Sequence, residues 1–401
     1  MIDPKKIEIE NYSYFLPEEL IAKFPRTKRE EARLMAYVNG EIIPSHFTEL
    51  SQYLNTNDTL VLNETKVIPA RLHFQKETGA EIEVFCLSPH KMEHQQAMDQ
   101  RSNVRWDALI GGAKKWKEGK LFKNILISGQ EIILSVEKIA TDPSFVVEFE
   151  WNGGVSFSEI MQHIGELPLP PYFERKATEE DLDRYQTVFA KNEGSVAAPT
   201  AGLHFTSEVL EDLELKGVKN EKLTLHVGSG TFKPVSTKTI EGHDMHAEYF
   251  DVPLDVILRL KNTSGRIIPV GTTSMRTLES IYWLGVKLIE TNHSLSELHL
   301  KQWDAYELPQ DITIQASFEA IINWCEMTER KRVVGSTALL MAPGYKVRVT
   351  AGLVTNFHLP QSTLILLVAA LIGEKWKEVY QKAVDEKFHF LSYGDSSILI
   401  P

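Results

Sequence analysis

The sequence predicts a mixed α/β protein into which a small antiparallel β domain is inserted. Residues 1–70 mix short strand and helix patterns, and this mixed pattern returns after Gly165. Between them, residues 71–155 contain regularly spaced short strands and no convincing long helix. We therefore expect a larger α/β domain made of residues 1–70 and 156–401, and an inserted barrel or sandwich at residues 71–155.

The first α/β segment contains a short helix, a strand and a basic cluster. Pro17 starts the predicted helix, since proline suits the first turn, and residues 60–63 form the predicted strand. Four basic residues lie between them: Arg26, Lys28, Arg29 and Arg33. Such a cluster is usually a solvated surface, and contact with phosphate is the alternative.

The central segment shows the alternation of a half-buried sheet. Residues 80–87 alternate with a period of two, and four further runs share this character, at 105–110, 124–127, 131–136 and 145–149. Lys114, Lys115 and Lys117 surround Trp116 in one predicted turn. A solvated hairpin is the simpler interpretation, and an edge that contacts phosphate is the alternative.

The second α/β segment contains three junctions where a strand or loop changes abruptly into a helix. The loop 194–205 precedes a helix with Thr206 as its N-cap, Gly271 follows the strand 266–270, and residues 359–363 precede the apolar helix 364–372. Loops at the carboxyl ends of strands tend to share one crevice in α/β folds. We therefore expect one pocket to contain the following residues of the junctions: Thr200, Gly202, Gly271, Thr272, Thr273, Ser274, Asn356 and His358.

Composition excludes several classes of protein. The net charge of −12 argues against a general polyanion binder, so a nucleic-acid site must be a local basic patch. Two cysteines, Cys86 and Cys325, are too few for a disulfide framework or a four-cysteine zinc site, and they suit a reducing cytosol. The most apolar run, 364–372, is far shorter than the ~20 residues that span a bilayer, so we expect a buried helix and no membrane partner.

Two further motifs leave other functions open. His243 and His246 have the spacing of paired metal ligands, and Glu248 follows, as in a metal-dependent hydrolase. This spacing is common by chance, and no other cluster of cysteine and histidine supports it, so we expect no metal. A non-catalytic RNA-binding protein, using the basic clusters alone, is the second alternative.

Several motifs together resemble the S-adenosylmethionine:tRNA ribosyltransferase-isomerases of queuosine biosynthesis. The resemblance to this family extends from about residue 13 to residue 399. The segment from about Val286 to Thr337 is longer than in most members, and Glu64 and Lys66 replace the more usual Asp and Arg. The matching stretches are 32–34, 63–72, 167–172, 197–206, 224–232, 245–248, 270–274, 355–360 and 392–395.

The resemblance implies a larger α/β domain with a small inserted β-barrel, and it implies a reaction. The ribosyl part of S-adenosylmethionine is transferred to the aminomethyl group of a 7-deazaguanine base, preQ1, at the wobble position of a tRNA. Adenine and methionine leave, and epoxyqueuosine-tRNA forms. S-adenosylmethionine is consumed as the ribosyl donor, no metal is needed, and we expect a cytoplasmic monomer.

The site residues follow from these motifs. His204 and His226 are the leading candidates for proton transfer, followed by Glu248 and Asp395, because a histidine can exchange protons near neutral pH. Thr272, Thr273 and Arg276 are candidates for binding the methionine carboxylate. Further substrate-binding candidates are Asn63, Arg71, Thr200, Gly202, Thr231, Asn356 and His358, and those for stacking on the base are Tyr172, Phe205 and Tyr393. The predicted tRNA-binding residues are Arg26, Lys28, Arg29, Lys114, Lys115 and Lys117.

Overall fold

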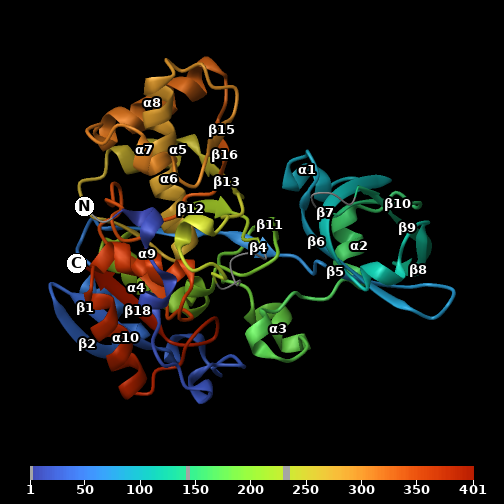
Figure 1. Ribbon diagram of the computed structural model, residues 1–401, viewed down its shortest axis with the longest axis horizontal. Coiled ribbons are helices and arrows are strands. Elements are labelled where there is room, and N and C mark those ends of the chain that lie inside the picture. Colours follow the sequence, from blue (N-terminus) through green and yellow to red (C-terminus); the bar gives the residue numbers. More distant parts are fainter. Residues whose placement is uncertain (1–2, 141–144, 229–234) are drawn as a thin grey trace.

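The computed structural model describes residues 3–140, 145–228 and 235–401. Figure 1 shows a large α/β body and, to one side of it, a separate β domain. Within these residues no helix is both long enough and apolar enough to cross a membrane. The predicted fold class, a larger α/β body with an inserted antiparallel β-barrel, is confirmed.

The α/β body contains two main sheets. A six-stranded mixed sheet has the order β14-β3-β12-β13-β16-β15, and its strands are β3 (Thr59–Asn63), β12 (Lys219–Leu225), β13 (Glu248–Pro253), β14 (Ile267–Pro269), β15 (Leu298–Leu300) and β16 (Arg332–Thr337). A four-stranded sheet has the order β17-β18-β1-β2, and its strands are β1 (Arg33–Val38), β2 (Glu41–His46), β17 (Leu353–Asn356) and β18 (Ser396–Ile400). β14, β3 and β12 are parallel, so their carboxyl ends lie at one edge.

The inserted domain is a nearly closed antiparallel barrel. Its order is β5-β6-β7-β10-β9-β8, and its strands are β5 (Arg71–Gln75), β6 (Glu81–Pro89), β7 (Asn103–Gly111), β8 (Leu121–Ile127), β9 (Gln130–Ala140) and β10 (Phe145–Trp151). The first and last strands of this order, β5 and β8, approach each other, since Lys123 Nζ of β8 donates a hydrogen bond to the carbonyl of His73 in β5. The alternating strands bury apolar side chains in the barrel interior, which forms a separate hydrophobic core.

This core also includes a helix from the segment that the sequence predicts to belong to the α/β body. Helix α2 (Phe157–Ile164) buries Phe157, Ile160 and Met161 against Trp106, Phe149 and other residues of the barrel. Ser156 caps the helix by accepting a hydrogen bond from the Glu159 amide. The division of the chain into domains remains a proposal, and we now propose residues 71–164 for the inserted one. The short parallel pair β4 (Thr65–Val67) and β11 (Asn192–Ser195) lies where the chain leaves and re-enters the body.

The remaining helices belong to the body, apart from the five-residue helix α1 (His94–Met98) of the inserted domain (Figure 1). Helix α6 (Thr272–Glu290) is the longest, and nearly all of its side chains are buried. The others are α3 (Glu179–Arg184), α4 (Ser207–Leu215), α5 (Leu254–Lys261), α7 (Asp304–Glu307), α8 (Ile314–Met327), α9 (Thr363–Ile372) and α10 (Lys375–Asp385). The predicted buried helix at 364–372 is α9, and Thr206 caps α4 as expected, accepting a hydrogen bond from the Val209 amide.

The long segment 286–337 completes the fold of the body. It supplies the end of α6, the helices α7 and α8, and the strands β15 and β16 of the six-stranded sheet. Helix α8 packs along α6, where Gly285 leaves room for the backbone of Ser317. One expectation was wrong: the helix at Pro17 is only a 3-10 turn, Glu18–Leu20, since no amphipathic run follows it.

Candidate active site

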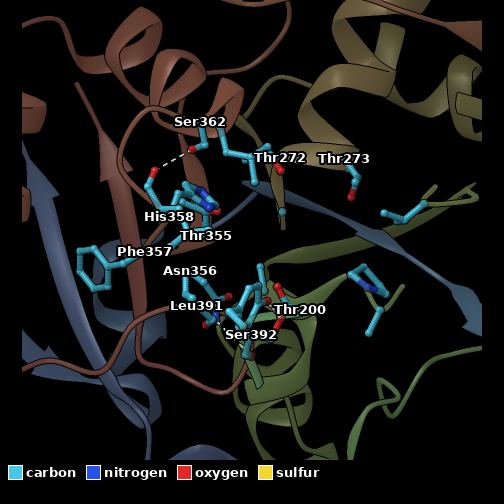
Figure 2. Close-up of a pocket in the computed structure, with 18 residues that line it drawn as sticks. Thr200, Thr272, Thr273, Thr355, Asn356, Phe357, His358, Ser362, Leu391 and Ser392 are labelled. Carbon is cyan, nitrogen blue, oxygen red and sulfur yellow. Dashed lines mark hydrogen bonds between the residues drawn. The ribbon is translucent and has the colours of Figure 1, made fainter. Parts of the chain in front are cut away.

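The three predicted junctions meet at one cavity, which we call the main cleft. It occupies about 730 Å³, including space open to solvent. Figure 2 shows hydroxyl, amide and imidazole side chains converging there from the three junctions and from Ser392. The described residues that line it are Tyr172, Ala198, Pro199, Thr200, Ala201, Val227, Gly271, Thr272, Thr273, Thr355, Asn356, Phe357, His358, Leu359, Ser362, Leu364, Leu391 and Ser392.

Backbone geometry explains how the junctions come together. Gly271 has a φ of +89°, which other residues rarely adopt, and it turns the chain from β14 into α6. Its amide donates a 2.7 Å hydrogen bond to the carbonyl of Val354 in β17, and this bond holds the two strand ends side by side. Helices α6 and α9 both start at the cleft, and Ser362 caps α9 by accepting from the Ile365 amide. The positive ends of two helices therefore face the main cleft, where they favour an anionic group.

Two buried polar atoms on the wall of the main cleft have no hydrogen-bond partner among the described residues. These are Thr273 Oγ1 and Asn356 Oδ1. The amide nitrogen of Asn356, by contrast, is 2.8 Å from the carbonyl of Leu391, to which it donates. Leaving a buried polar atom unpaired costs about 1–3 kcal/mol, so such atoms need an explanation. A ligand in the main cleft would satisfy both.

His358 is the histidine on the wall of the main cleft. Its Nε2 lies 3.1 Å from Thr355 Oγ1, and its side chain is buried. Burial lowers the pKa of His358 to about 3, so the imidazole is neutral near pH 7. The hydroxyl of Tyr172 forms a hydrogen bond with Ser392 Oγ on the same wall. The main cleft therefore offers a neutral imidazole beside a fixed network of hydroxyl groups.

The two histidines predicted to transfer protons lie behind this wall. His204 Nε2 is 3.3 Å from the amide nitrogen of Asn356, and burial lowers the pKa of His204 to about 4. His226 Nδ1 is 3.0 Å from Thr65 Oγ1, and its ring lies 4.1 Å from the ring of His94. Burial lowers the pKa of His226 to about 4 as well. Each ring is already engaged by neighbouring side chains.

A second cavity, which occupies about 670 Å³ including space open to solvent, adjoins the main cleft through Leu364. His243, His246, Glu248 and Arg276 are on its wall. Arg276 Nη1 forms a buried 2.5 Å ion pair with Glu248 Oε2, whose other oxygen accepts from the Gly228 amide. Across the described residues, no group of three or more His, Cys, Asp or Glu side chains is arranged to hold a metal ion.

A third cavity, which we call the arginine pocket, occupies about 280 Å³, including space open to solvent. Its lining residues are Pro25, Arg26, Arg29, Arg184, Leu203, His204, Ser392 and Tyr393. Arg26 Nη2 pairs with buried Asp395 at 2.7 Å. Burial raises the pKa of Asp395, but hydrogen bonds from His389 and the charge of Arg26 outweigh this and lower it overall. Asp395 therefore remains ionised as a structural partner of Arg26.

Five predicted substrate-binding residues do not line the main cleft and contact other parts of the protein. Asn63 joins β3 to β12 through the backbone of Leu225, and Arg71 pairs with Glu83 in the barrel. Gly202 packs against Thr187 and Phe189, and Phe205 is fully buried beside Phe47. Tyr393 donates to Asp181 at 2.8 Å and stacks on Phe173. Thr231 lies outside the described residues.

The predicted basic residues fall into two groups. Arg26 and Arg29 line the arginine pocket, and Lys28 beside them is exposed. Lys114, Lys115 and Lys117 are exposed between β7 and β8, in the inserted domain. The two groups do not form one continuous border around the main cleft.

Several residues of the cavities were not predicted. Thr355, Ser362 and Ser392 line the main cleft, and Arg184 lines the arginine pocket. Ser362 and Ser392 lie within the junction and turn motifs quoted above, so a search for every hydroxyl of those motifs would have found them. Arg184 is the last residue of the acidic helix α3, and no sequence pattern indicates that it faces Arg29.

Fold and site together define an α/β protein with a polar cleft at two helix N-termini. The chain belongs to the queuosine biosynthesis protein family, whose family profile matches residues 9–399. The resemblance inferred from the sequence motifs is thereby confirmed. The crystal structure of an S-adenosylmethionine tRNA ribosyltransferase from Thermotoga maritima is similar at 27% sequence identity, with 97% of this chain and 99% of that chain covered and a TM-score of 0.46.

Proposed function

We propose that this protein transfers and isomerises the ribosyl group of S-adenosylmethionine onto preQ1 in tRNA, yielding epoxyqueuosine-tRNA, adenine and methionine. Membership of the queuosine biosynthesis family over residues 9–399 carries this proposal. The main cleft supports it, since hydroxyl, amide and imidazole side chains line it beside the N-termini of α6 and α9.

The methionine carboxylate of the substrate fits the start of α6. Thr272 and Thr273 belong to the first turn of this helix, where backbone amides are free and the helix dipole is positive. The unpaired hydroxyl of Thr273 provides a further donor. Arg276 is less suited as a direct ligand, because it opens onto the second cavity and pairs with Glu248.

Proton transfer in the main cleft is best assigned to His358. The sulfonium of S-adenosylmethionine acidifies the C5′ proton, so a neutral imidazole can assist in its removal. His358 lies on the wall of the cleft and is neutral near pH 7 because burial lowers its pKa to about 3. His204 and His226 remain secondary candidates. Glu248 and Asp395 are already engaged in buried ion pairs with Arg276 and Arg26, so we rank both below the histidines as bases.

The tRNA base enters from the side of Tyr172 in this proposal. Tyr172 is the aromatic stacking candidate on the wall of the main cleft, whereas Phe205 is in the core and Tyr393 is bound to Asp181. An anticodon base is single-stranded and can be splayed out to stack on an aromatic ring. Because tRNA is the substrate, we place the reaction in the cytoplasm, and one chain supplies every cleft residue named, so a monomer suffices.

The proposal is tested by incubating the protein with S-adenosylmethionine and tRNA that carries preQ1, and measuring free adenine. We expect adenine release that depends on preQ1. The same tRNA with guanine at the wobble position is the matched control. Release of adenine that is equal for both tRNAs, or absent for both, contradicts the proposal.

A further inference from the structure

We propose that the arginine pocket binds one phosphodiester group of the tRNA strand, next to the base that enters the main cleft. This inference rests on the function proposed above and adds to it a defined binding site for the RNA backbone. The pocket brings together three guanidinium groups, those of Arg26, Arg29 and Arg184, which come from two segments of the chain about 155 residues apart.

The arginine pocket has excess positive charge. Asp395 neutralises only Arg26. In the described part of the chain, the hydrogen bonds of Arg29 and Arg184 go to backbone carbonyls instead: Arg29 donates to Asp183, Gln186 and Leu203, and Arg184 donates to Arg26 and Thr27. Neutral carbonyls orient a guanidinium without cancelling its charge. The pocket therefore carries about two uncompensated positive charges.

These two charges repel each other in the absence of a ligand. The pKa of Arg29 is lowered, first because its guanidinium is partly buried and second because Arg184 is close. The exposed carboxylate of Asp183 and the hydroxyl of Tyr393 act in the opposite direction, but less strongly than burial and Arg184. An anion between the guanidinium groups would relieve this repulsion.

Unpaired N–H donors of the arginines also indicate that the pocket binds an anion. The Nε atoms of Arg26 and of Arg184 are buried and have no hydrogen-bond partner among the described residues. Guanidinium groups bind phosphate through several N–H donors at once, and backbone bonds that fix their orientation reduce the entropy lost on binding. The pocket is thus preorganised for an oxyanion.

The position of the arginine pocket indicates that the anion belongs to the RNA substrate. Ser392 lines both the pocket and the main cleft, and His204 on the pocket wall contacts Asn356 on the cleft wall. One nucleotide strand can therefore place a base in one cavity and a phosphate in the other. The chain carries a net charge of −12, so RNA needs such a local basic site to approach the cleft.

The test compares R184Q with wild-type protein in binding a preQ1-containing anticodon stem-loop over a range of salt concentrations. One phosphate contact in a single strand contributes about 0.7 to the slope of log K against log salt, so R184Q should lower the slope by about 0.7 and weaken binding at least ~10-fold. R184K keeps the charge and should restore the slope. R330Q is the control, because Arg330 is exposed, follows α8 in the chain and does not line the arginine pocket.

Single methylphosphonate substitutions in the stem-loop identify the phosphate. We expect one position near the wobble base to weaken binding to wild-type protein and to weaken binding to R184Q less, because Arg184 no longer contributes there. If R184Q fails to fold, the methylphosphonate series is measured with the wild type and R184K. One sensitive position is still expected in both proteins, and its absence would overturn the inference. Equal losses at every position, or an unchanged salt slope for R184Q, overturn the inference.

Two further measurements separate the alternatives. Inorganic phosphate that binds the pocket while no methylphosphonate position matters would identify a free phosphate ligand and overturn the assignment to RNA. Adenine release by the wild-type protein is assayed in parallel. If adenine is released but the slope of R184Q is unchanged, only this inference fails; if the wild type binds tRNA and releases no adenine, the proposed function fails.

Discussion

Replacing Thr273 by valine should affect ligand binding and protein stability in opposite directions. The hydroxyl of Thr273 is buried on the wall of the main cleft and has no hydrogen-bond partner among the described residues. Valine has nearly the same shape, so T273V removes an unpaired polar atom and creates no cavity. Because such an atom costs about 1–3 kcal/mol when buried, T273V should be at least as stable as the wild type.

Binding should weaken in the same variant. If Thr273 donates to the substrate carboxylate, the lost hydrogen bond is to a charged group and amounts to about 1.5–3 kcal/mol. The Kd for S-adenosylmethionine should therefore rise roughly 10- to 150-fold. Isothermal titration calorimetry measures the Kd, and urea unfolding measures the stability.

Thr277 provides the matched control one turn further along α6. Its hydroxyl donates a 2.9 Å hydrogen bond to the carbonyl of Thr273 and does not line the main cleft. T277V should lose about 0.5–1.5 kcal/mol of stability and keep the wild-type Kd. The reasoning is refuted if T273V binds S-adenosylmethionine normally, or if it is destabilised as much as T277V.

Three further predictions follow from the site. H358Q should lower turnover by about two to four powers of ten while both substrates still bind, and near-normal turnover would transfer the role of base to His204 or His226. Burial lowers the pKa of His204 to about 4 and of His358 to about 3, below the 6.5 of a free histidine, so the unfolded chain takes up protons first on acidification. Stability should be fully present above about pH 6.5 and fall towards pH 4, by at most about 1.4 kcal/mol per pH unit for each histidine, and a constant urea midpoint over that range would contradict this. Treatment with a chelator should leave adenine release unchanged. A loss of adenine release would instead support a metal site at His243, His246 and Glu248.

Local signals in the sequence were sufficient for the architecture. The period-two alternation at 80–87 and the strands after it predict the barrel, because alternating side chains suit a sheet with one buried face. The domain boundary stays a proposal, and the packing of α2 is the reason why we now propose residue 164 in place of residue 155. Helix α2 looks like any amphipathic helix in the sequence, and only the structure shows that its apolar side packs inside the barrel.

The sequence also indicated which junctions meet, since loops with hydroxyl groups follow strands whose carboxyl ends share an edge. It could not indicate which side chains face the cavity. His204 and His358 are both histidines beside small-residue loops, yet only His358 lines the main cleft. The partner of each group, such as Asn356 for His204 or Asp181 for Tyr393, comes from residues more than 150 positions away, and no local pattern encodes it.

The central claim is that the ribosyl group of S-adenosylmethionine reaches the wobble base of tRNA. The most direct measurement uses S-adenosylmethionine labelled in its ribose, with preQ1-containing tRNA, and determines the mass of the modified nucleoside together with free adenine and methionine. Our account predicts a labelled nucleoside, adenine and methionine in equal amounts. Adenine and methionine without label in the nucleoside, or label in tRNA that lacks preQ1, would contradict it.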